Sequence, residues 1–93
     1  MKFESSTNDK GKAFDEKTIR LVWKKKHLNS SASDQVGFDC CGSLMLYIYY
    51  KDRSSIYGWE IDHILAREQG GKSILENLQP LNWKNNVDKS TVQ

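Results

Sequence analysis

The apolar residues of this sequence occur only in short runs, the longest being Leu44–Tyr50. A helix that crosses a bilayer needs about 20 predominantly apolar residues in succession, so no run is long enough to form one. The first residues, MKFESSTNDKGK, are polar and lack the apolar centre of a secretory signal. Ninety-three residues with 38% hydrophobic and 28% charged content suffice for one small core. These features predict a single-domain cytoplasmic protein.

Charge is distributed unevenly along the chain. Residues 1–31 contain eight Lys or Arg and four Asp or Glu, a net charge of +4, whereas residues 32–93 contain six and eight, a net charge of −2. The basic part could bind phosphate groups, and some of the acidic excess could lie around a cation. A solvated tail and an exposed helix face explain the composition equally well.

The N-terminal third predicts a tail followed by a helix. Residues 1–13 are poor in apolar side chains and predict a flexible polar tail. Residues 14–28 predict a helix, with an apolar stripe formed by Ile19, Val22 and Trp23. Trp23 is therefore expected in the core. His27 is expected to be an exposed residue at the helix end.

The next stretch predicts a linker and a hairpin. Residues 29–37 have the composition of a linker, and residues 38–50 contain two strand-like runs with Gly42 at the turn. Periodicity does not decide whether Leu44–Ile48 forms a buried strand or a short helical turn. Cys40 and Cys41 are adjacent, which suits neither a disulfide framework nor the usual spacing of zinc ligands. We expect them to be reduced and partly buried.

Residues 56–64, IYGWEIDHI, predict a strand that places an acid beside a histidine. Trp59 and Ile61 are expected to anchor this strand in the core. Successive strand residues point to opposite faces, so His63 could face a substrate while Asp62 faces a bound cation. For these two residues alone, a surface hydrogen-bonded pair is the more common explanation.

The C-terminal part predicts a long loop and a second helix. Residues 65–76 read as a loop with a Gly-Gly turn, and Asn77 could fix this loop by hydrogen-bonding backbone groups. Asn82 could cap a helix that runs to about Ser90. A hard cation such as Mg²⁺ prefers oxygen ligands, which side-chain amides of this helix could provide. The candidates are Asn82, Asn85 and Asn86.

The segment GWEIDHILAREQGG, followed by NLQPLNWKNNVDK, closely resembles the HNH endonucleases. Their motif runs D-H-I, a Gly-Gly loop, N-L-Q-P-L, and a final His or Asn followed by x-x-K. Upstream, TIRLVWKKKH and FDCCGSLMLYIYY are similar to the V-W-x-K helix and D-x-C-G hairpin of some members. The resemblance implies an α+β fold over residues 14–93, a small ββα-metal (His-Me finger) domain with an additional N-terminal helix and hairpin.

The resemblance also implies a role for each motif residue. His63 would be the general base, Asp62 and Asn86 would hold one divalent ion, and Asn77 would keep the histidine-bearing loop in shape. Asn85 could compete with Asn86 for the metal, although alignment to the following Lys favours Asn86. Asn instead of His at the last position favours Mg²⁺ or Mn²⁺ over Zn²⁺. Asn also replaces the cysteines that bind structural zinc in some members, so no structural zinc is expected.

The implied reaction is hydrolysis of phosphodiester bonds in DNA with a single metal ion, which leaves a 5′-phosphate and a 3′-hydroxyl. Neutral His63 would take a proton from the attacking water, so activity is expected to fall below about pH 6.5. Lys89, Arg67 and Lys72 would contact phosphates, or each could be an ordinary solvated residue.

Two other readings remain open. One is a non-catalytic nucleic-acid-binding module on the same fold, and the other is a small structural domain with a buried Asp-His pair. A nuclease of this size has no separate specificity domain, so a partner protein could direct it. A homodimer, or two successive nicks, could cut both strands. DNA and RNA both remain open as substrates.

Overall fold

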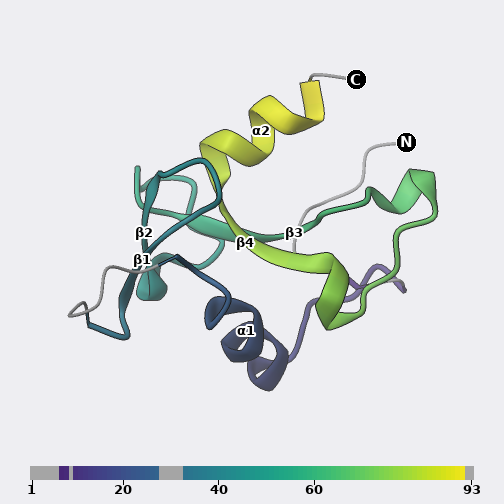
Figure 1. The fold of residues 1–93 in the computed structure, drawn as a ribbon, viewed down its shortest axis with the longest axis horizontal. Helices are drawn as coiled ribbons and strands as arrows, with labels where there is room; N and C mark the ends of the chain where they lie inside the picture. Colours follow the sequence, from purple (N-terminus) through teal and green to yellow (C-terminus); the bar gives the residue numbers. More distant parts are fainter. Residues whose placement is uncertain (1–6, 9, 28–32, 92–93) are drawn as a thin grey trace.

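The computed structural model describes residues 7–8, 10–27 and 33–91. This part of the chain is a small α+β structure with two α-helices and two antiparallel sheets of two strands each, which confirms the α+β part of the predicted fold. Figure 1 shows the two helices on opposite sides of the β3–β4 sheet. The elements are α1 (Glu16–Trp23), β1 (Val36–Phe38), β2 (Leu44–Leu46), β3 (Trp59–His63), β4 (Leu78–Asn82) and α2 (Trp83–Thr91).

Helix α1 begins directly after its N-cap residue, Asp15. The Asp15 carboxylate accepts a hydrogen bond from the backbone N–H of Thr18 at 2.8 Å, as an N-cap residue should. Val22 and Trp23 are buried, so the predicted apolar stripe faces the core. The helix ends at Trp23, earlier than expected. The chain then turns, and His27 forms a β-bridge with Phe38 while its side chain remains exposed.

The β1–β2 hairpin contains the predicted turn, in which Gly42 has a φ of 84°. Both alternatives for the apolar run are realised, because β2 is followed at once by a 3-10 turn over Tyr47–Tyr49. The linker prediction is wrong from Val36 onward, where β1 begins, and residues 29–32 lie outside the described residues.

The cysteines at this turn were expected to be partly buried, and this prediction is wrong. Cys40 and Cys41 are both free thiols and both exposed. The buried position belongs to the preceding Asp39, which is 2% exposed. Its Oδ1 accepts hydrogen bonds from the backbone N–H groups of Cys41 (3.0 Å) and Ser43 (2.9 Å). The carboxylate therefore shapes the turn from inside and leaves the thiols in solvent.

Strands β3 and β4 form the sheet that carries the candidate site. Their register pairs Ile61 with Pro80 and Asp62 with Gln79. Strand β4 was not predicted from the residue pattern, since Pro is normally excluded from the interior of a sheet. It is tolerated here because β4 pairs on one side only, with β3. Asn82 ends β4 and caps α2 as expected, accepting the Lys84 N–H at 3.0 Å.

An aromatic cluster packs around Trp59 and holds β3 in the core. Trp59 and Ile61 are fully buried, as predicted. The Trp59 ring lies 4.8 Å from the Trp23 ring and 4.8 Å from the Tyr50 ring, centroid to centroid. Burial of large aromatic side chains dominates the energetics of a core this small. The strand that bears the Asp-His pair is thus fixed in place by its own apolar residues.

Part of the predicted tail is described. Residues 1–6 and 9 lie outside the described residues, whereas Thr7 forms a β-bridge with Ala13 and is buried. The Arg67 side chain donates a hydrogen bond to the Thr7 hydroxyl at 3.0 Å. None of the helices in the described segments has both the length and the apolar content that a membrane span would need.

Candidate active site

The last two residues of β3 send their side chains to opposite faces of the sheet. Asp62 contacts Lys89 on α2, while His63 lies toward the loop that follows β3, with its ring centroid 6.3 Å from that of Phe14. Both side chains are buried, although the segment that follows them, Ile64 and Leu65, is exposed. The candidate site therefore lies at the end of a strand whose residues are buried.

The Asp62 carboxylate is bound on one oxygen. Its Oδ2 accepts hydrogen bonds from Gln79 Nε2 at 2.9 Å and from Lys89 Nζ at 2.7 Å. Among the described residues, no hydrogen bond is made to its Oδ1. The carboxylate is thus held in one orientation by two donors and keeps one oxygen for a further ligand.

Lys89 binds the end of β3 through its ammonium group. Besides Asp62, its ammonium group donates to the backbone oxygen of His63 at 2.8 Å and to that of Ile64 at 3.3 Å. The side chain remains 40% exposed. These contacts make Lys89 a residue that positions the Asp-His pair. A contact between Lys89 and phosphate stays a prediction.

Two residues that the sequence did not single out, Arg53 and Glu60, form an ion pair that extends from the strand bearing this pair. Glu60 is two residues before Asp62 in β3 and therefore on the same face of the sheet. The Arg53 guanidinium donates from Nε to Glu60 Oε2 (2.6 Å) and from Nη2 to Oε1 (2.9 Å). These hydrogen bonds raise the pKa of Arg53 above its usual value. Strand alternation was the one signal that could have linked Glu60 to the site.

The candidate asparagines have different partners. Asn86 Nδ2 donates to Glu60 Oε1 at 2.8 Å, on the face of β3 that also carries Asp62. Asn85 Nδ2 instead donates to Asp39 Oδ2 at 2.7 Å and to the Ser43 hydroxyl at 2.8 Å. Asn82 Nδ2 donates to two backbone oxygens, at 3.1 and 2.9 Å. Of the three, Asn86 is the one whose amide binds a residue on the Asp62 face of β3.

The contact with Glu60 fixes which way the Asn86 amide points. Because Nδ2 is the donor to Glu60, the amide oxygen is turned to the other side, where no described residue donates to it. The structure thus presents two oriented oxygens, Asp62 Oδ1 and Asn86 Oδ1. Within the described ranges, no three His, Cys, Asp or Glu side chains gather to hold a metal ion. A hard cation here would have to complete its shell with water or substrate oxygens.

Asn77 ties the ends of the loop after His63. Its Oδ1 accepts the Leu65 N–H at 2.8 Å, and its Nδ2 donates to the backbone oxygens of Leu65 (3.1 Å) and Lys72 (3.0 Å). Its own backbone oxygen accepts the Ile64 N–H at 2.8 Å. From the other side, Lys25, in the turn after α1, donates to the backbone oxygens of Leu75 and Leu78. The long loop therefore has a defined base.

The two glycines make this loop possible. Gly70 has a φ of 92°, in the left-handed region that side chains disfavour. Gly71 donates its N–H to Ala66 O at 2.9 Å, and a Cβ at Gly71 would lie 1.7 Å from Leu65 O. The backbone passes itself too closely there for any side chain.

His63 makes a polar contact with this loop. Its Nε2 lies 2.7 Å from the Ser73 hydroxyl, two residues after the Gly-Gly turn. Ser73 was not a predicted site residue, and a single serine in a polar loop carries no signal that would have identified it. The contact links the orientation of the imidazole ring to the fold of the loop.

The remaining predicted residues lie in the same loop. Arg67 binds the Thr7 hydroxyl, and Lys72 is exposed. The contacts described for them do not include Asp62 or Asn86. Their binding to phosphate stays a prediction.

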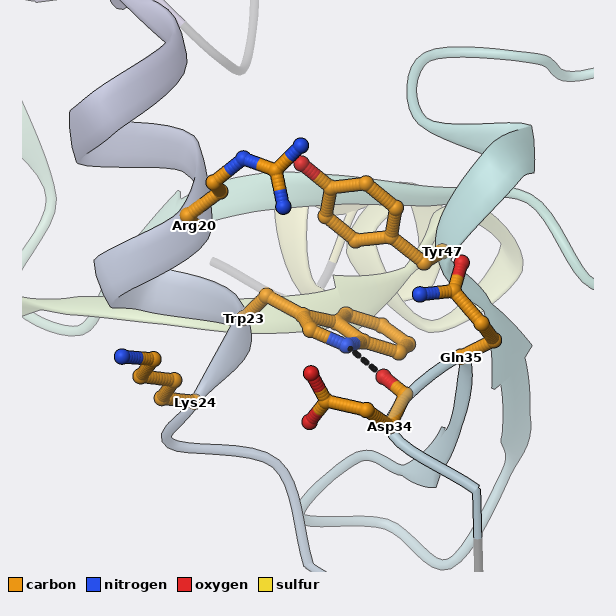
Figure 2. A pocket seen from close by; sticks show the side chains of 6 residues that line it. All are labelled: Arg20, Trp23, Lys24, Asp34, Gln35 and Tyr47. Carbon is orange, nitrogen blue, oxygen red and sulfur yellow. Dashed lines mark hydrogen bonds between the residues drawn. The ribbon is translucent and has the colours of Figure 1, made fainter.

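The cavity shown in Figure 2 is not at this site. It has a volume of about 260 Å³ and lies between α1 and the start of the β1–β2 hairpin. Trp23, in its wall, is buried and donates its indole N–H to the Asp34 backbone oxygen at 2.7 Å. None of the motif residues lines it. The lining residues are Arg20, Trp23, Lys24, Asp34, Gln35 and Tyr47.

Comparison with known proteins gives one match. A family model described as HNH endonuclease matches residues 40–91, more than half of the chain. The matched segment runs from the turn of the β1–β2 hairpin to the end of α2 and includes Asp62, His63, Asn77 and Asn86. The comparison with curated proteins finds no match, and neither does the comparison with solved structures.

Proposed function

The chain belongs to the HNH endonuclease family, and on that premise we propose that it is a divalent-metal-dependent endonuclease that hydrolyses phosphodiester bonds of DNA. We assign the nuclease domain to residues 14–93. The observation that carries the proposal is that Asp62 and Asn86 each present an oriented oxygen on the same side of β3, while Asn77 holds the loop that follows His63.

Asp62 and Asn86 are the proposed metal ligands. Each presents an oxygen that accepts no hydrogen bond from the described residues, and each is held in orientation by contacts to its other polar atom. Two oxygen donors suit Mg²⁺ or Mn²⁺ better than Zn²⁺. When bound, such an ion supplies positive charge for the phosphate oxygens and the leaving 3′-oxygen. Asn85 is less suitable, since its amide nitrogen binds Asp39 and Ser43.

His63 is the proposed general base. It ends β3, directly after the proposed ligand Asp62, and is kept in place by the loop that Asn77 closes. Its neutral imidazole would take the proton of the attacking water. Asn77 acts through His63 as a positioning residue, because its three side-chain hydrogen bonds set the path of the loop.

The test is cleavage of supercoiled plasmid DNA with Mg²⁺ or Mn²⁺. We expect nicking by the unaltered protein, abolition by EDTA, and loss with His63→Ala. His27→Ala is the matched control, because His27 is an exposed histidine outside the site. Nicking that survives His63→Ala at the rate of the unaltered protein would exclude His63 as the base.

A non-catalytic nucleic-acid-binding module is the second candidate function. It is favoured by one observation, namely that Lys89 already neutralises Asp62 at 2.7 Å. A binding module would retain salt-sensitive DNA binding and yield no nicked product with any divalent ion. The same plasmid assay, run beside a binding titration, separates the two functions.

A further inference from the structure

Arg53 combines a fixed guanidinium edge with an exposed one. It lies in the polar turn between the 3-10 segment Tyr47–Tyr49 and β3. Its side chain is 52% exposed, whereas that of its partner Glu60 is 6% exposed. Two hydrogen bonds, from Nε and Nη2, hold it to the Glu60 carboxylate. The ion pair therefore anchors the guanidinium in one orientation at the protein surface.

The donors that remain on Arg53 are directed away from Glu60. Nη1 makes no hydrogen bond to any of the described residues. The guanidinium carbon lies 6.0 Å from the centroid of the Trp83 ring, which supports the group from the side of α2. A planar guanidinium held along one edge can bind a phosphate along another, and the entropy of ordering its long side chain has then already been lost.

Arg53 is connected to the site through a shared residue. Glu60 Oε1 accepts hydrogen bonds from both Arg53 Nη2 (2.9 Å) and Asn86 Nδ2 (2.8 Å). Glu60 and Asp62 lie on the same face of β3, so Arg53 is on the side of the sheet that carries both proposed metal ligands. Two carboxylates on this face would repel a phosphodiester. Arg53 and Lys89 supply the opposing charge.

We propose that Arg53 binds a phosphate of the nucleic acid backbone at the nuclease site and that Glu60 holds the guanidinium for this purpose. The inference rests on the proposed function, which supplies the polyanionic substrate. It adds a phosphate-binding residue outside the sequence motif. Arg53 lies ten residues upstream of His63 in the chain and reaches the site only through the fold.

The first test is DNA binding in EDTA, which needs neither metal nor cleavage. A short duplex is titrated at several salt concentrations with the unaltered protein and with Arg53→Gln. Loss of one phosphate contact should reduce the slope of log K against log salt by about 0.9. Lys24→Gln is the charge-matched control, since Lys24 is exposed beside α1 on the opposite side of the sheet. Equal slopes for the unaltered protein and Arg53→Gln would overturn the proposal.

The second test separates phosphate binding from simple neutralisation of Glu60. Arg53→Gln leaves the buried Glu60 carboxylate without its ion pair and should lower the melting temperature. The double variant Arg53→Gln/Glu60→Gln removes both charges and should restore much of this stability. We expect plasmid cleavage to remain about 100-fold below that of the unaltered protein in both variants, as when one donor to a reacting group is lost. Recovery of cleavage in the double variant would refute phosphate binding by Arg53.

The two proposals fail in different ways. If the unaltered protein binds DNA but never cleaves it, the proposed function fails, and the salt slopes still decide whether Arg53 contacts phosphate. If the unaltered protein cleaves and Arg53→Gln matches it in both rate and slope, only the inference about Arg53 fails.

Discussion

Replacing Asn77 by alanine should show how much the loop after His63 depends on one side chain. The substitution removes all three side-chain hydrogen bonds, at 2.8, 3.1 and 3.0 Å. It leaves the backbone contact from Ile64 N–H to Asn77 O in place. Besides this backbone contact, the His63–Ser73 contact at 2.7 Å and the hydrogen bonds from Lys25 would remain to hold the loop.

The expected cost follows from the number of bonds and their exposure. A typical intramolecular hydrogen bond contributes about 0.5–1.5 kcal/mol to stability. The loop is partly exposed, so water can replace some of the lost contacts, and we expect a total loss of about 2 kcal/mol. For a domain of this size that corresponds to a fall in melting temperature of about 8–16 °C. A displacement of His63 by about 1 Å would lower cleavage by about 100-fold.

The aspartate variant makes the prediction sharper. Asn77→Asp preserves the size of the side chain and the acceptor for Leu65 N–H, but it replaces the amide donor with an oxygen. That oxygen would face the backbone oxygens of Leu65 and Lys72, with which it can form no hydrogen bond at neutral pH. Asn77→Asp should therefore be at least as unstable as Asn77→Ala.

The assay is thermal unfolding followed by circular dichroism, together with plasmid nicking at a temperature where all variants are folded. Glu68→Ala is the control, because Glu68 is an exposed residue of the same loop. It should change stability by less than about 0.5 kcal/mol. The reasoning is refuted if Asn77→Asp keeps the stability and activity of the unaltered protein, since the two donor bonds would then be irrelevant.

Three further outcomes are expected. Asp39→Ala should lower the free energy of unfolding by about 3 kcal/mol or more in a urea titration, because the buried carboxylate accepts four hydrogen bonds. Gly71→Ala should destabilise the loop and reduce nicking, because its Cβ would meet Leu65 O at 1.7 Å; unchanged melting and nicking would contradict this. Although Cys40 is exposed, desolvation by the surrounding turn and the neighbouring Cys41 thiol raise its pKa, so its alkylation by iodoacetamide should be slower in the folded than in the urea-unfolded protein at pH 8. The folded protein keeps this thiol protonated to higher pH, so stability should decline as pH rises above the ordinary thiol value.

Local patterns predicted the elements whose apolar residues follow a simple period. The stripe that ends at Trp23 gave α1, and the alternation through Trp59 and Ile61 gave β3. Strand β4 has no comparable signal, because Pro80 interrupts it and its last residue is the cap of α2. Only the family resemblance implied a second strand there. A two-stranded sheet tolerates a proline that residue propensities exclude.

The candidate site residues could be named from the sequence because they lie in one continuous motif. Asp62, His63, Asn77 and Asn86 all lie within it, and their roles stay predictions. The pattern could not specify that Lys89 would bind Asp62, nor that Arg53, in the turn before β3, would bind Glu60. Both contacts depend on the packing of α2 and of the polar turn against β3. A single sequence gives no measure of that packing.

The position of α2 rests on polar contacts more than on apolar burial. Its apolar residues Trp83 and Val87 are only partly buried. The helix is instead tied to the β1–β2 hairpin through Asp39, whose Oδ2 accepts the Asn82 N–H at 3.0 Å and the Asn85 amide at 2.7 Å.

Polar side chains at both ends of α2 therefore set where the proposed ligand Asn86 stands. Asp39 holds the first turn, and Lys89 binds the end of β3 one turn after Asn86. Hydrogen bonds are directional, so they fix the rotation of a helix about its axis more tightly than a small apolar contact can. A rotation of one residue would turn Asn85 toward β3 and Asn86 away from it. The hairpin upstream of the motif is thus part of what keeps Asn86 on the same face as Asp62.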